Sequence, residues 1–366
     1  MSGPLEGIVV ADFSRVLAGP YATMLLGDLG AEVVKVERPG SGDDTRAWGP
    51  PYAPSGQSTY FAGVNRNKIS VGIDLATPEG VLAARELIDR ADVVVENFKV
   101  GTLERLGLDY ASVSAHHPGL IFCTISGFGS GEGRDLPGYD LLVQAMGGLM
   151  SITGPAPGKP TKVGVALVDV ITGLHATVGV LAALHHRDAT GEGQLLEVNL
   201  MSSLLSALVN QSSAYAAGGV VPGILGNAHP SISPYEVYAT ADRPLIIAVG
   251  NDRQFASLAE VVGAPQLAGD ARFATNPERV ANRVALKEEL LGLLQAAGAD
   301  EWQRRLTAVG VPCGPINDIG QAFAFADRLG LAPIVDAGGT PTVAHPIRFD
   351  RTPATYRLAP PDAPEA

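Results

Sequence analysis

Cysteine, basic charge and aromatic residues are all scarce in this chain of 366 residues. Its two cysteines, Cys123 and Cys313, lie far apart and form no CxxC or Cys/His spacing, which argues against a zinc site or a disulfide framework. Lys and Arg number 26 against 38 Asp and Glu, and the net charge of −12 argues against a nucleic-acid-binding surface. An anionic ligand is not excluded, because a few local cations can hold phosphate groups in an acidic protein.

A targeting segment and a long apolar run are also missing from the sequence pattern. The first residues, 1–7, lead straight into a strand-like segment without a basic or long apolar leader, and we find no run of membrane-spanning length. Hydrophobic residues make up 46% and charged residues 17%, which is typical of a well-buried globular protein. We expect a soluble, cytoplasmic protein that binds neither membranes nor nucleic acid.

Strand-like and helix-like patterns alternate over the first half of the chain. The expected strands are 7–13, 31–37, 70–75, 92–96, 119–126 and 193–199. The expected helices are 20–29, 78–90, 103–116, 169–187 and 200–217. This order predicts a doubly wound α/β layer with a parallel sheet and right-handed crossovers.

A change of composition marks a second unit. The stretch 218–234 is rich in Gly, Pro and Ser and is expected to be a linker. Beyond it we expect strands at 235–239 and 244–249 and helices at 252–263, 278–297, 300–309 and 318–328. From Leu331 the chain is Pro- and Gly-rich with extended character through Arg357, and 359–366 is expected to be a loose tail.

Two common chemistries lack their sequence signature. The turn after the first expected strand, 14–20, holds one glycine and not the glycine fingerprint of dinucleotide-binding proteins. The glycines of 127–133 are spaced as GxGxGxG and do not open a helix, so a nicotinamide dehydrogenase is disfavoured. No Gly-x-Ser-x-Gly elbow has a histidine partner, which disfavours a serine hydrolase. His229 is the one histidine in a loop that could face a ligand.

The segment 164–173 carries the strongest candidate for chemistry. Asp169 stands between a short apolar run and the first turn of a long expected helix. Because a helix N-terminus carries partial positive charge, we expect this carboxylate to stay ionised in apolar surroundings, where it could act as a covalent nucleophile. The structural alternative is that Asp169 merely caps the helix, as most Asp residues before helices do.

Basic side chains recur at the ends of the expected strands and at loop starts. Ligands of doubly wound folds collect outside the carboxyl ends of the strands, so cations gathered there would suit a phosphorylated ligand. Each one alone is more often a solvated surface charge. The set consists of Arg15, Arg38, Arg66, Lys68, Lys99 and Arg105.

The order of these segments resembles the family III CoA-transferases, a family that also includes formyl-CoA transferase, carnitine CoA-transferase and the α-methylacyl-CoA racemases. The similarity covers nearly the whole chain. The matching stretches are 4–10, 16–22, 26–40, 65–70, 95–107, 138–140, the Asp169 segment, 191–194, 226–230 and 249–252.

The resemblance implies a fold, an assembly and a set of roles. It implies a Rossmann-like large domain that binds CoA (1–215 with 331–366), a smaller α+β domain (225–330), and an obligate, interlocked homodimer. By the same resemblance Asp169 is the nucleophile, acyl-CoA is a substrate, and no metal or tightly bound cofactor is needed. The expected CoA contacts are Val16, Arg38, Lys68, Asn97, Phe98, Lys99, Arg105 and Leu106. The expected substrate contacts are Arg15, Tyr139, Asp140, His229, Gly250 and Asn251.

Two reactions are open within this family, and one non-catalytic role lies outside it. The racemases carry a histidine where this chain has Tyr139, and tyrosine is a poor general base at neutral pH, so CoA transfer is favoured over proton transfer at Cα. An acyl-CoA-binding regulatory protein would not need the intact Asp169 context. Arg15, with Arg46 as a candidate second cation, would suit the distal carboxylate of a dicarboxylate acceptor. We expect a succinyl-CoA-like donor.

Overall fold

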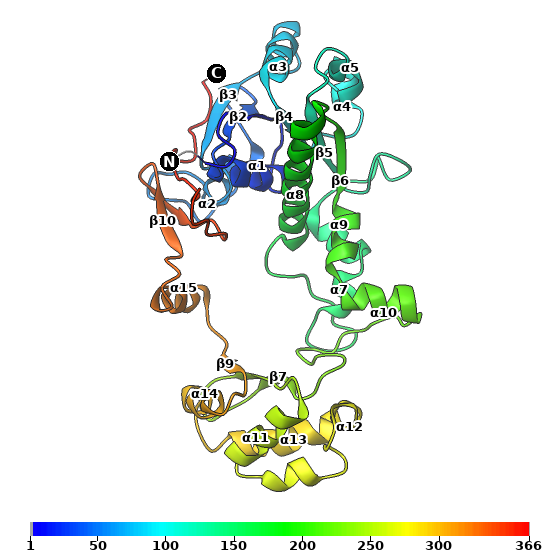
Figure 1. Cartoon of the computed structure of the whole chain (residues 1–366), viewed down its shortest axis with the longest axis vertical. Helices are drawn as coiled ribbons and strands as arrows, with labels where there is room; N and C mark the ends of the chain where they lie inside the picture. Colours follow the sequence, from blue (N-terminus) through cyan, green and yellow to red (C-terminus); the bar gives the residue numbers. More distant parts are fainter. Residues whose placement is uncertain (1–2, 366) are drawn as a thin grey trace. The chain divides into compact units, whose positions relative to one another are not determined.

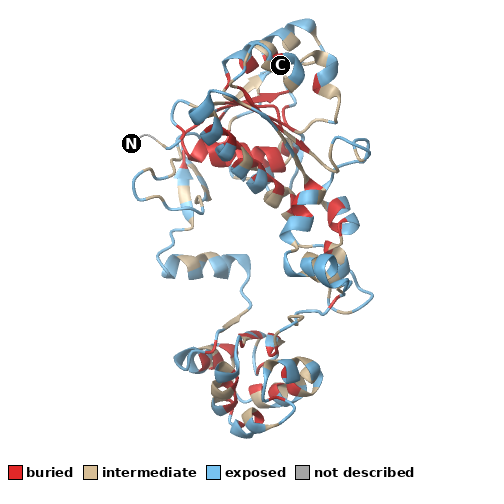
Figure 2. Cartoon of the chain, turned by 45° about the vertical axis from the view of Figure 1, so that its right-hand side comes forward, coloured by how far each residue is buried: buried red, intermediate tan, exposed pale blue. Residues whose placement is uncertain are grey.

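The computed structural model describes residues 3–365, and the chain divides into two compact units (Figure 1). One unit consists of the chain up to Leu149, Lys162–Val221 and the chain from Ala332 onward. The other consists of Met150–Thr161 and Pro222–Leu331. Figure 2 shows that buried residues gather inside each unit, so each has a core of its own.

A six-stranded parallel sheet forms the centre of the first unit. Its strands are β1 (Val9–Asp12), β2 (Glu32–Glu37), β3 (Lys68–Gly72), β4 (Val93–Glu96), β5 (Ile121–Ser126) and β6 (Leu195–Asn199). The order across the sheet is β3-β2-β1-β4-β5-β6, and every neighbouring pair is parallel. The expected doubly wound sheet is therefore confirmed, and the order reverses between β1 and β4.

Helices cover both faces of this sheet. On one face α1 (Ala18–Asp28) packs against α8 (Leu167–Thr190), and α8 also contacts β5 and β6. On the other face one apolar cluster joins the strands to α3 (Pro78–Arg90), α4 (Thr102–Leu106) and α5 (Tyr110–Ser114). This double cover explains why the strand β4 is buried along its whole length.

Two expected helices are each broken in two. The segment 103–116 forms α4 and α5 because Gly107, with φ of 66°, ends α4 in the left-handed region. The segment 200–217 forms α9 (Leu200–Ala207) and α10 (Asn210–Gly218), which are separated where Val209 has φ of 41°. The sequence pattern missed several short elements of this unit: η1 (Asp44–Ala47), α2 (Thr59–Ala62), α6 (Asp140–Met146), β10 (Ile334–Ala337) and β11 (Thr340–Val343). It also missed α7 (Leu149–Ile152), most of which belongs to the second unit.

The C-terminal tail is fixed rather than loose. Arg46 Nη1 donates to the carbonyl of Pro361 at 2.9 Å, and Gln57 Nε2 reaches the same oxygen at 3.1 Å. The amide of Gly40 donates to the carbonyl of Pro364 at 3.2 Å. The prediction of a loose tail is therefore wrong for its described residues, because their carbonyls are hydrogen-bonded to the segments that follow β2.

The helix α8 corrects another expectation. With 24 residues and few charges, it is long and apolar enough to cross a membrane by length and composition alone. In the structure it packs against α1 and the sheet, and Thr172, Ala176, Val180 and Ala183 are buried there. A core helix of a globular protein passes the same test, so this feature is weak evidence for a membrane span.

The second unit is an α+β arrangement around its own core. The strands β7 (Tyr235–Tyr238), β8 (Leu245–Ala248) and β9 (Cys313–Pro315) form an antiparallel sheet. Its helices are α11 (Asp252–Val261), η2 (Pro265–Gly269), α12 (Asn276–Ala281), α13 (Arg283–Leu294), α14 (Ala299–Ala308) and α15 (Ile319–Arg328). The expected helix 278–297 is split at Asn282, and the short strand β9 was not predicted.

Candidate active site

A cavity of about 500 Å³ opens at the carboxyl ends of β1, β4 and β5. This is the place where the strand order reverses, and doubly wound folds bind their ligands there. Its lining comes from four parts of the first unit: 15–18, 97–100, 125–127 and 134–140. Asp44, Asp169 and Leu200 complete it.

Asp169 lies in the first turn of α8 and lines the cavity. Burial raises the pKa of its carboxyl from the ordinary 3.8 to about 7, and the negative charge of Asp140 adds to the effect. The expectation that the helix N-terminus would keep Asp169 firmly ionised is therefore wrong. The capping alternative is wrong as well, since Ala166 occupies the N-cap position.

The cap of α8 comes instead from Asp140, at the start of α6. Its Oδ1 accepts the amides of Val168 at 2.8 Å and Asp169 at 3.4 Å. Its Oδ2 accepts a hydrogen bond from the buried Gln144 at 2.6 Å, and Gln144 Oε1 in turn accepts the amide of Val163 at 2.9 Å. Asp140 thus takes the favourable helix-terminal amides, which leaves Asp169 without them and next to a second negative charge.

The loop after β1 is tied to the loop after β4. Arg15 N–H donates to Asn97 Oδ1 at 2.8 Å, and Asn97 Nδ2 donates back to the Arg15 carbonyl at 2.7 Å. These two bonds use one of the two Nδ2 protons and one of the two Oδ1 lone pairs of Asn97, and they hold the two loops together at the cavity. The Arg15 guanidinium carbon lies 5.2 Å from the ring centre of Phe98, and Nη1 lies 3.7 Å from Asp44 Oδ2.

The structure brings most of the predicted site residues of the first unit to this cavity. They are Arg15, Val16, Asn97, Phe98, Lys99, Tyr139, Asp140 and Asp169. Tyr139 is the N-cap residue of α6 and is 66% exposed, which leaves its side chain accessible to a ligand. Gly127 lies so close to Gly138 that a Cβ at Gly127 would stand 2.4 Å from the Cα of Gly138, and only glycine fits there.

Lys68 does not line the cavity. Its side chain is wholly buried, and Nζ lies 3.0 Å from Asp12 Oδ2, 2.9 Å from the Pro20 carbonyl and 3.0 Å from Asn65 Oδ1. Burial lowers the pKa of Lys68 to about 8. The predicted contact between Lys68 and CoA is incompatible with this structure, because all three ammonium protons have partners within the protein.

Three other predicted CoA contacts lie outside the cavity lining. Arg38 Nη2 stands 3.2 Å from Asp44 Oδ1, and Arg105 Nη2 donates to Thr102 Oγ1 at 3.3 Å. Both hydrogen bonds lie at the exposed surface, so both guanidinium groups are accessible. Leu106 packs against the apolar cluster of the α3 face.

The remaining predicted contacts belong to the second unit. His229 Nδ1 accepts the amide of Ser231 at 3.1 Å, and its ring centre lies 5.3 Å from that of Tyr235. The Gly250 amide donates to Gln254 Oε1 at 2.8 Å, and Asn251 caps α11 by accepting the Gln254 amide at 2.9 Å. The Gly250 amide therefore already has an acceptor within the protein, so it is not a free donor for the substrate contact expected there.

The sequence reasoning missed one aromatic pair. Burial raises the pKa of Tyr60 to about 12, and the charge of Asp169 is the next cause, so the phenol of Tyr60 lies near that carboxylate. The Trp48 ring packs edge-on against Tyr60 with 5.2 Å between centroids. The one sequence signal that could have pointed to this pair is the rarity of tryptophan, since the chain has two tryptophans.

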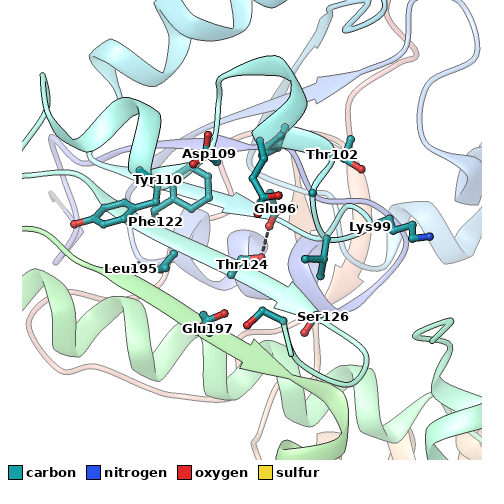
Figure 3. A pocket seen from close by; sticks show the side chains of 16 residues that line it. Glu96, Lys99, Thr102, Asp109, Tyr110, Phe122, Thr124, Ser126, Leu195 and Glu197 are labelled. Atoms are coloured by element: carbon teal, nitrogen blue, oxygen red, sulfur yellow. Dashed lines mark hydrogen bonds between the residues drawn. The ribbon is translucent and has the colours of Figure 1, made fainter. Parts of the chain in front are cut away.

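A second cavity of about 270 Å³ adjoins the first and shares Lys99, Val100 and Ser126 with it (Figure 3). The carboxyl group of Glu96 lies in it, hydrogen-bonded to the Thr124 hydroxyl and, at 2.8 Å, to the Phe98 amide. Burial raises the pKa of Glu96 to about 7. Glu96 therefore supports the loop after β4 from this second cavity, while Asp169 lines the first.

No metal centre accompanies these cavities. Within residues 3–365 no three or more His, Cys, Asp or Glu side chains are grouped so that they could hold a metal ion. The chemistry available at the first cavity is that of a buried carboxylate, an arginine, a tyrosine and backbone amides.

The fold and the cavity at its switch point define a ligand-binding α/β protein of the doubly wound class. Residues 5–365 match the model of CoA-transferase family III, so the chain belongs to this family and is a CoA-transferase. It is 45% identical to the succinate–glutarate CoA-transferase of Agrobacterium fabrum, over 96% of this chain and 91% of the relative. It is 42% identical to the succinyl-CoA:glutarate CoA-transferase of Homo sapiens, over 88% of this chain and 73% of the relative.

A solved structure shares the fold over the whole chain. It is that of a CAIB/BAIF family protein from Brucella suis, which is 42% identical to this chain and superimposes with a TM-score of 0.90. The match covers 100% of this chain and 97% of the Brucella suis chain. The resemblance to the family seen in the sequence is thereby confirmed. Of the two reactions that the sequence left open, CoA transfer is the one that the relatives support.

Proposed function

We propose that this enzyme transfers CoA from succinyl-CoA to a small dicarboxylate, with Asp169 as the covalent nucleophile. The observation that carries the proposal is a buried carboxylate with a raised pKa that lines a cavity together with Arg15. The names of two relatives support succinyl-CoA as the donor and a dicarboxylate as the acceptor, since both names combine succinate or succinyl-CoA with glutarate.

The reaction proceeds through two anhydrides and a thioester. The Asp169 carboxylate attacks the thioester carbonyl of the donor, which forms an aspartyl–acyl anhydride and releases CoA thiolate. The thiolate attacks the aspartyl carbonyl, so that the donor leaves as a free carboxylate and an aspartyl–CoA thioester remains. The acceptor carboxylate then displaces the thiolate to form a second anhydride. Attack of the thiolate on the acceptor's carbonyl releases the new acyl-CoA and restores Asp169.

The surroundings of Asp169 suit this chemistry. A carboxylate with a pKa near 7 is a stronger nucleophile than an ordinary aspartate, and about half of it is ionised at neutral pH. Each step exchanges one activated acyl bond for another, so no step requires a large free-energy input. Backbone amides of the loop that starts at Gly127 lie at the cavity and are candidate donors to the oxyanions.

Arg15 is the proposed determinant of the acceptor. Its Nε is buried and has no hydrogen-bond partner among the described residues, so it can donate to a ligand. A guanidinium binds a carboxylate through two parallel hydrogen bonds, which suits the distal carboxylate of a dicarboxylate. Arg46 cannot take the second place suggested by the sequence, because it is bound to Glu37 and to the tail carbonyl of Pro361.

The proposed CoA contacts at the cavity are Val16, Asn97, Phe98 and Lys99. Arg38 and Arg105 are proposed to meet the phosphates outside it, and Leu106 and the substrate contacts His229, Gly250 and Asn251 stay predictions. We further infer that the large domain expected over 1–215 with 331–366 binds CoA and that 225–330 form the small domain, with the segment 150–161 belonging to the second compact unit. We also propose that the enzyme has no tightly bound cofactor and that it is located in the cytoplasm.

An obligate, interlocked homodimer is also proposed. Two exposed apolar faces support it among the described residues. On α8, Leu174, Val178 and Leu181 are 41%, 64% and 36% exposed although they are apolar and one or two turns apart. On α15, Ile319 and Phe325 are 76% and 43% exposed, and the helix has no buried residue. Sedimentation equilibrium over a range of protein concentrations tests this assembly.

Mass spectrometry tests the nucleophile and the substrates together. Wild type and Asp169→Ala are incubated with succinyl-CoA, trapped with hydroxylamine, and offered a panel of free carboxylic acids. We expect an adduct on Asp169 in the wild type, none in the variant, and CoA passed to a dicarboxylate. Deuterium exchange into Cα of a 2-methylacyl-CoA, without an adduct or transfer, would instead indicate a racemase.

A further inference from the structure

A fully buried ion pair beside the cavity has no part in the mechanism above. Lys35 Nζ lies 3.0 Å from Asp43 Oδ2, and neither side chain has any exposed surface. Lys35 belongs to β2, and Asp43 precedes η1. Desolvation largely offsets the attraction within such a pair, so stability alone is a weak reason for its presence.

Both partners hold the backbone of the loop that lines the cavity. Lys35 Nζ donates to the Ser14 carbonyl at 2.9 Å, and the Val16 amide donates to Asp43 Oδ2 at 3.3 Å. The other oxygen of Asp43 accepts the amide of Thr45 at 2.9 Å and its hydroxyl at 2.7 Å. The carboxylate is therefore fixed on both sides and cannot turn away from the loop.

Val16 has a backbone conformation that its own side chain disfavours. Its φ is 70°, in the left-handed region that β-branched residues rarely adopt. Such strain persists only where the surroundings enforce it. Here the enforcing contacts are the Lys35–Asp43 pair and the two hydrogen bonds that join Arg15 to Asn97.

The enforced conformation has a consequence for the nucleophile. Val16 packs on the same small apolar cluster as Ala166, the N-cap residue of α8, and Val170, which follows Asp169 in the chain. The members of that cluster are Leu17, Met24 and Val64. An apolar side chain at this place removes water from the surroundings of Asp169.

We propose that Lys35 and Asp43 are positioning residues for the transfer reaction, which hold Val16 where it shields Asp169 from water. The inference rests on the proposed role of Asp169 as the nucleophile. Neither residue reaches the substrate, since both are buried. Asp140 from α6 and Tyr60 from α2 act on Asp169 or respond to its charge. The other charged or titratable residues that line the same cavity are Arg15, Asp44, Lys99, Arg134, Asp135 and Tyr139.

The direct test is a titration of the Asp169 carboxyl by ¹³C NMR, with its signal assigned by comparison with Asp169→Asn. The variant replaces both partners, Lys35→Met with Asp43→Asn, so that no uncompensated charge stays buried. We expect the pKa of Asp169 to fall by about one unit or more toward its ordinary value. We also expect kcat to fall about tenfold or more, while KM for succinyl-CoA changes much less.

A less buried ion pair at the amino end of β4, away from the cavity, serves as the control. Arg187 Nη1 lies 2.8 Å from Asp92 Oδ1, at the start of that strand and far along α8 from Asp169. Arg187→Met with Asp92→Asn should lower the melting temperature and leave the pKa of Asp169 unchanged. If the Lys35–Asp43 variant does not fold, Val16→Gly replaces it, because glycine accepts a φ of 70° and removes the shielding side chain.

An unchanged pKa of Asp169 in the folded Lys35–Asp43 variant, or in Val16→Gly, would overturn the inference. A fall in the pKa of Asp169 in the Arg187–Asp92 control variant that is as large as in the Lys35–Asp43 variant would overturn the inference too. Failure of the proposed function has a separate signature, which is full transferase activity in Asp169→Ala. The titration still decides the shielding role in that case, because it does not depend on turnover.

Discussion

Replacing Asp140 by asparagine should move the pH dependence of catalysis in a direction fixed by the geometry. The amide oxygen of the new side chain can still accept the amides of Val168 and Asp169, which now bond to the Asp140 carboxylate, but the side chain carries no charge. The charge of Asp140 is one of the two causes of the raised pKa of Asp169, and burial is the larger. The substitution should therefore lower that pKa and keep the helix cap, while the bond from Gln144 Nε2 is lost because the new amide nitrogen takes the place of Oδ2.

The size of the effect follows from these two causes. The pKa of Asp169 is raised from 3.8 to about 7, and we assign about one pH unit, or ~1.4 kcal/mol, to the charge of Asp140. The acid limb of kcat/KM should then move from near pH 7 to near pH 6. At pH 6 the ionised fraction of Asp169 rises from about a tenth to about a half, so activity relative to the plateau rises about fivefold. The plateau itself should fall, because a less basic carboxylate is a weaker nucleophile.

The assay is kcat/KM for succinyl-CoA between pH 5 and 9 at constant ionic strength. Asp140→Glu is the matched control, because it keeps the charge and should keep the acid limb near pH 7. Glu96 also has a pKa near 7, so the series is repeated with Glu96→Gln to separate its titration from that of Asp169. An acid limb that stays in place or moves to higher pH in Asp140→Asn would refute the reasoning.

Three further predictions follow from the same contacts. In Arg15→Ala, KM for a dicarboxylate acceptor should rise about tenfold or more, because its distal carboxylate loses its partner. KM for a monocarboxylate of equal length should stay constant. Equal changes of KM for both acids in steady-state assays would contradict this role of Arg15. Asp169→Asn should raise the melting temperature at pH 8. The folded-state pKa lies above the ordinary 3.8, so the wild type is destabilised at high pH. The cost is complete above about pH 7, decreases as pH falls from about 7 to about 4, and is absent below that range. The gain, about 2–4 kcal/mol at most, should fall to roughly half or less of its pH 8 value by about pH 5 in thermal melts, and a gain independent of pH would argue against it. Arg46→Ala should make the 360–365 tail sensitive to limited proteolysis, because Arg46 donates to the carbonyls of Pro361 and Asp362. The control is Arg38→Ala, since Arg38 forms its ion pair with Asp44 and not with the tail.

The sequence by itself determined the sheet and the family. The six strands of the first unit lie within a few residues of their expected places. The four inner strands β1, β2, β4 and β5 are largely buried, and such strands read as short apolar runs between turns. Asp169 was singled out by its place at the start of a long apolar helix, whereas its role as the nucleophile came from the resemblance to the family and stays a prediction. These features depend on neighbours in the chain, which a sequence pattern records.

Only the tertiary structure decided how the side chains of the site are used. Lys68 is bound by Asp12, which is 56 residues away in the chain, and α8 is capped by Asp140, which is 28 residues before Val168. Such pairings arise where the sheet and its loops bring distant segments together, and no local pattern encodes them. The same holds for the pKa of Asp169: the chain places it at a helix N-terminus, but burial and the charge of Asp140 raise its pKa because both act through space.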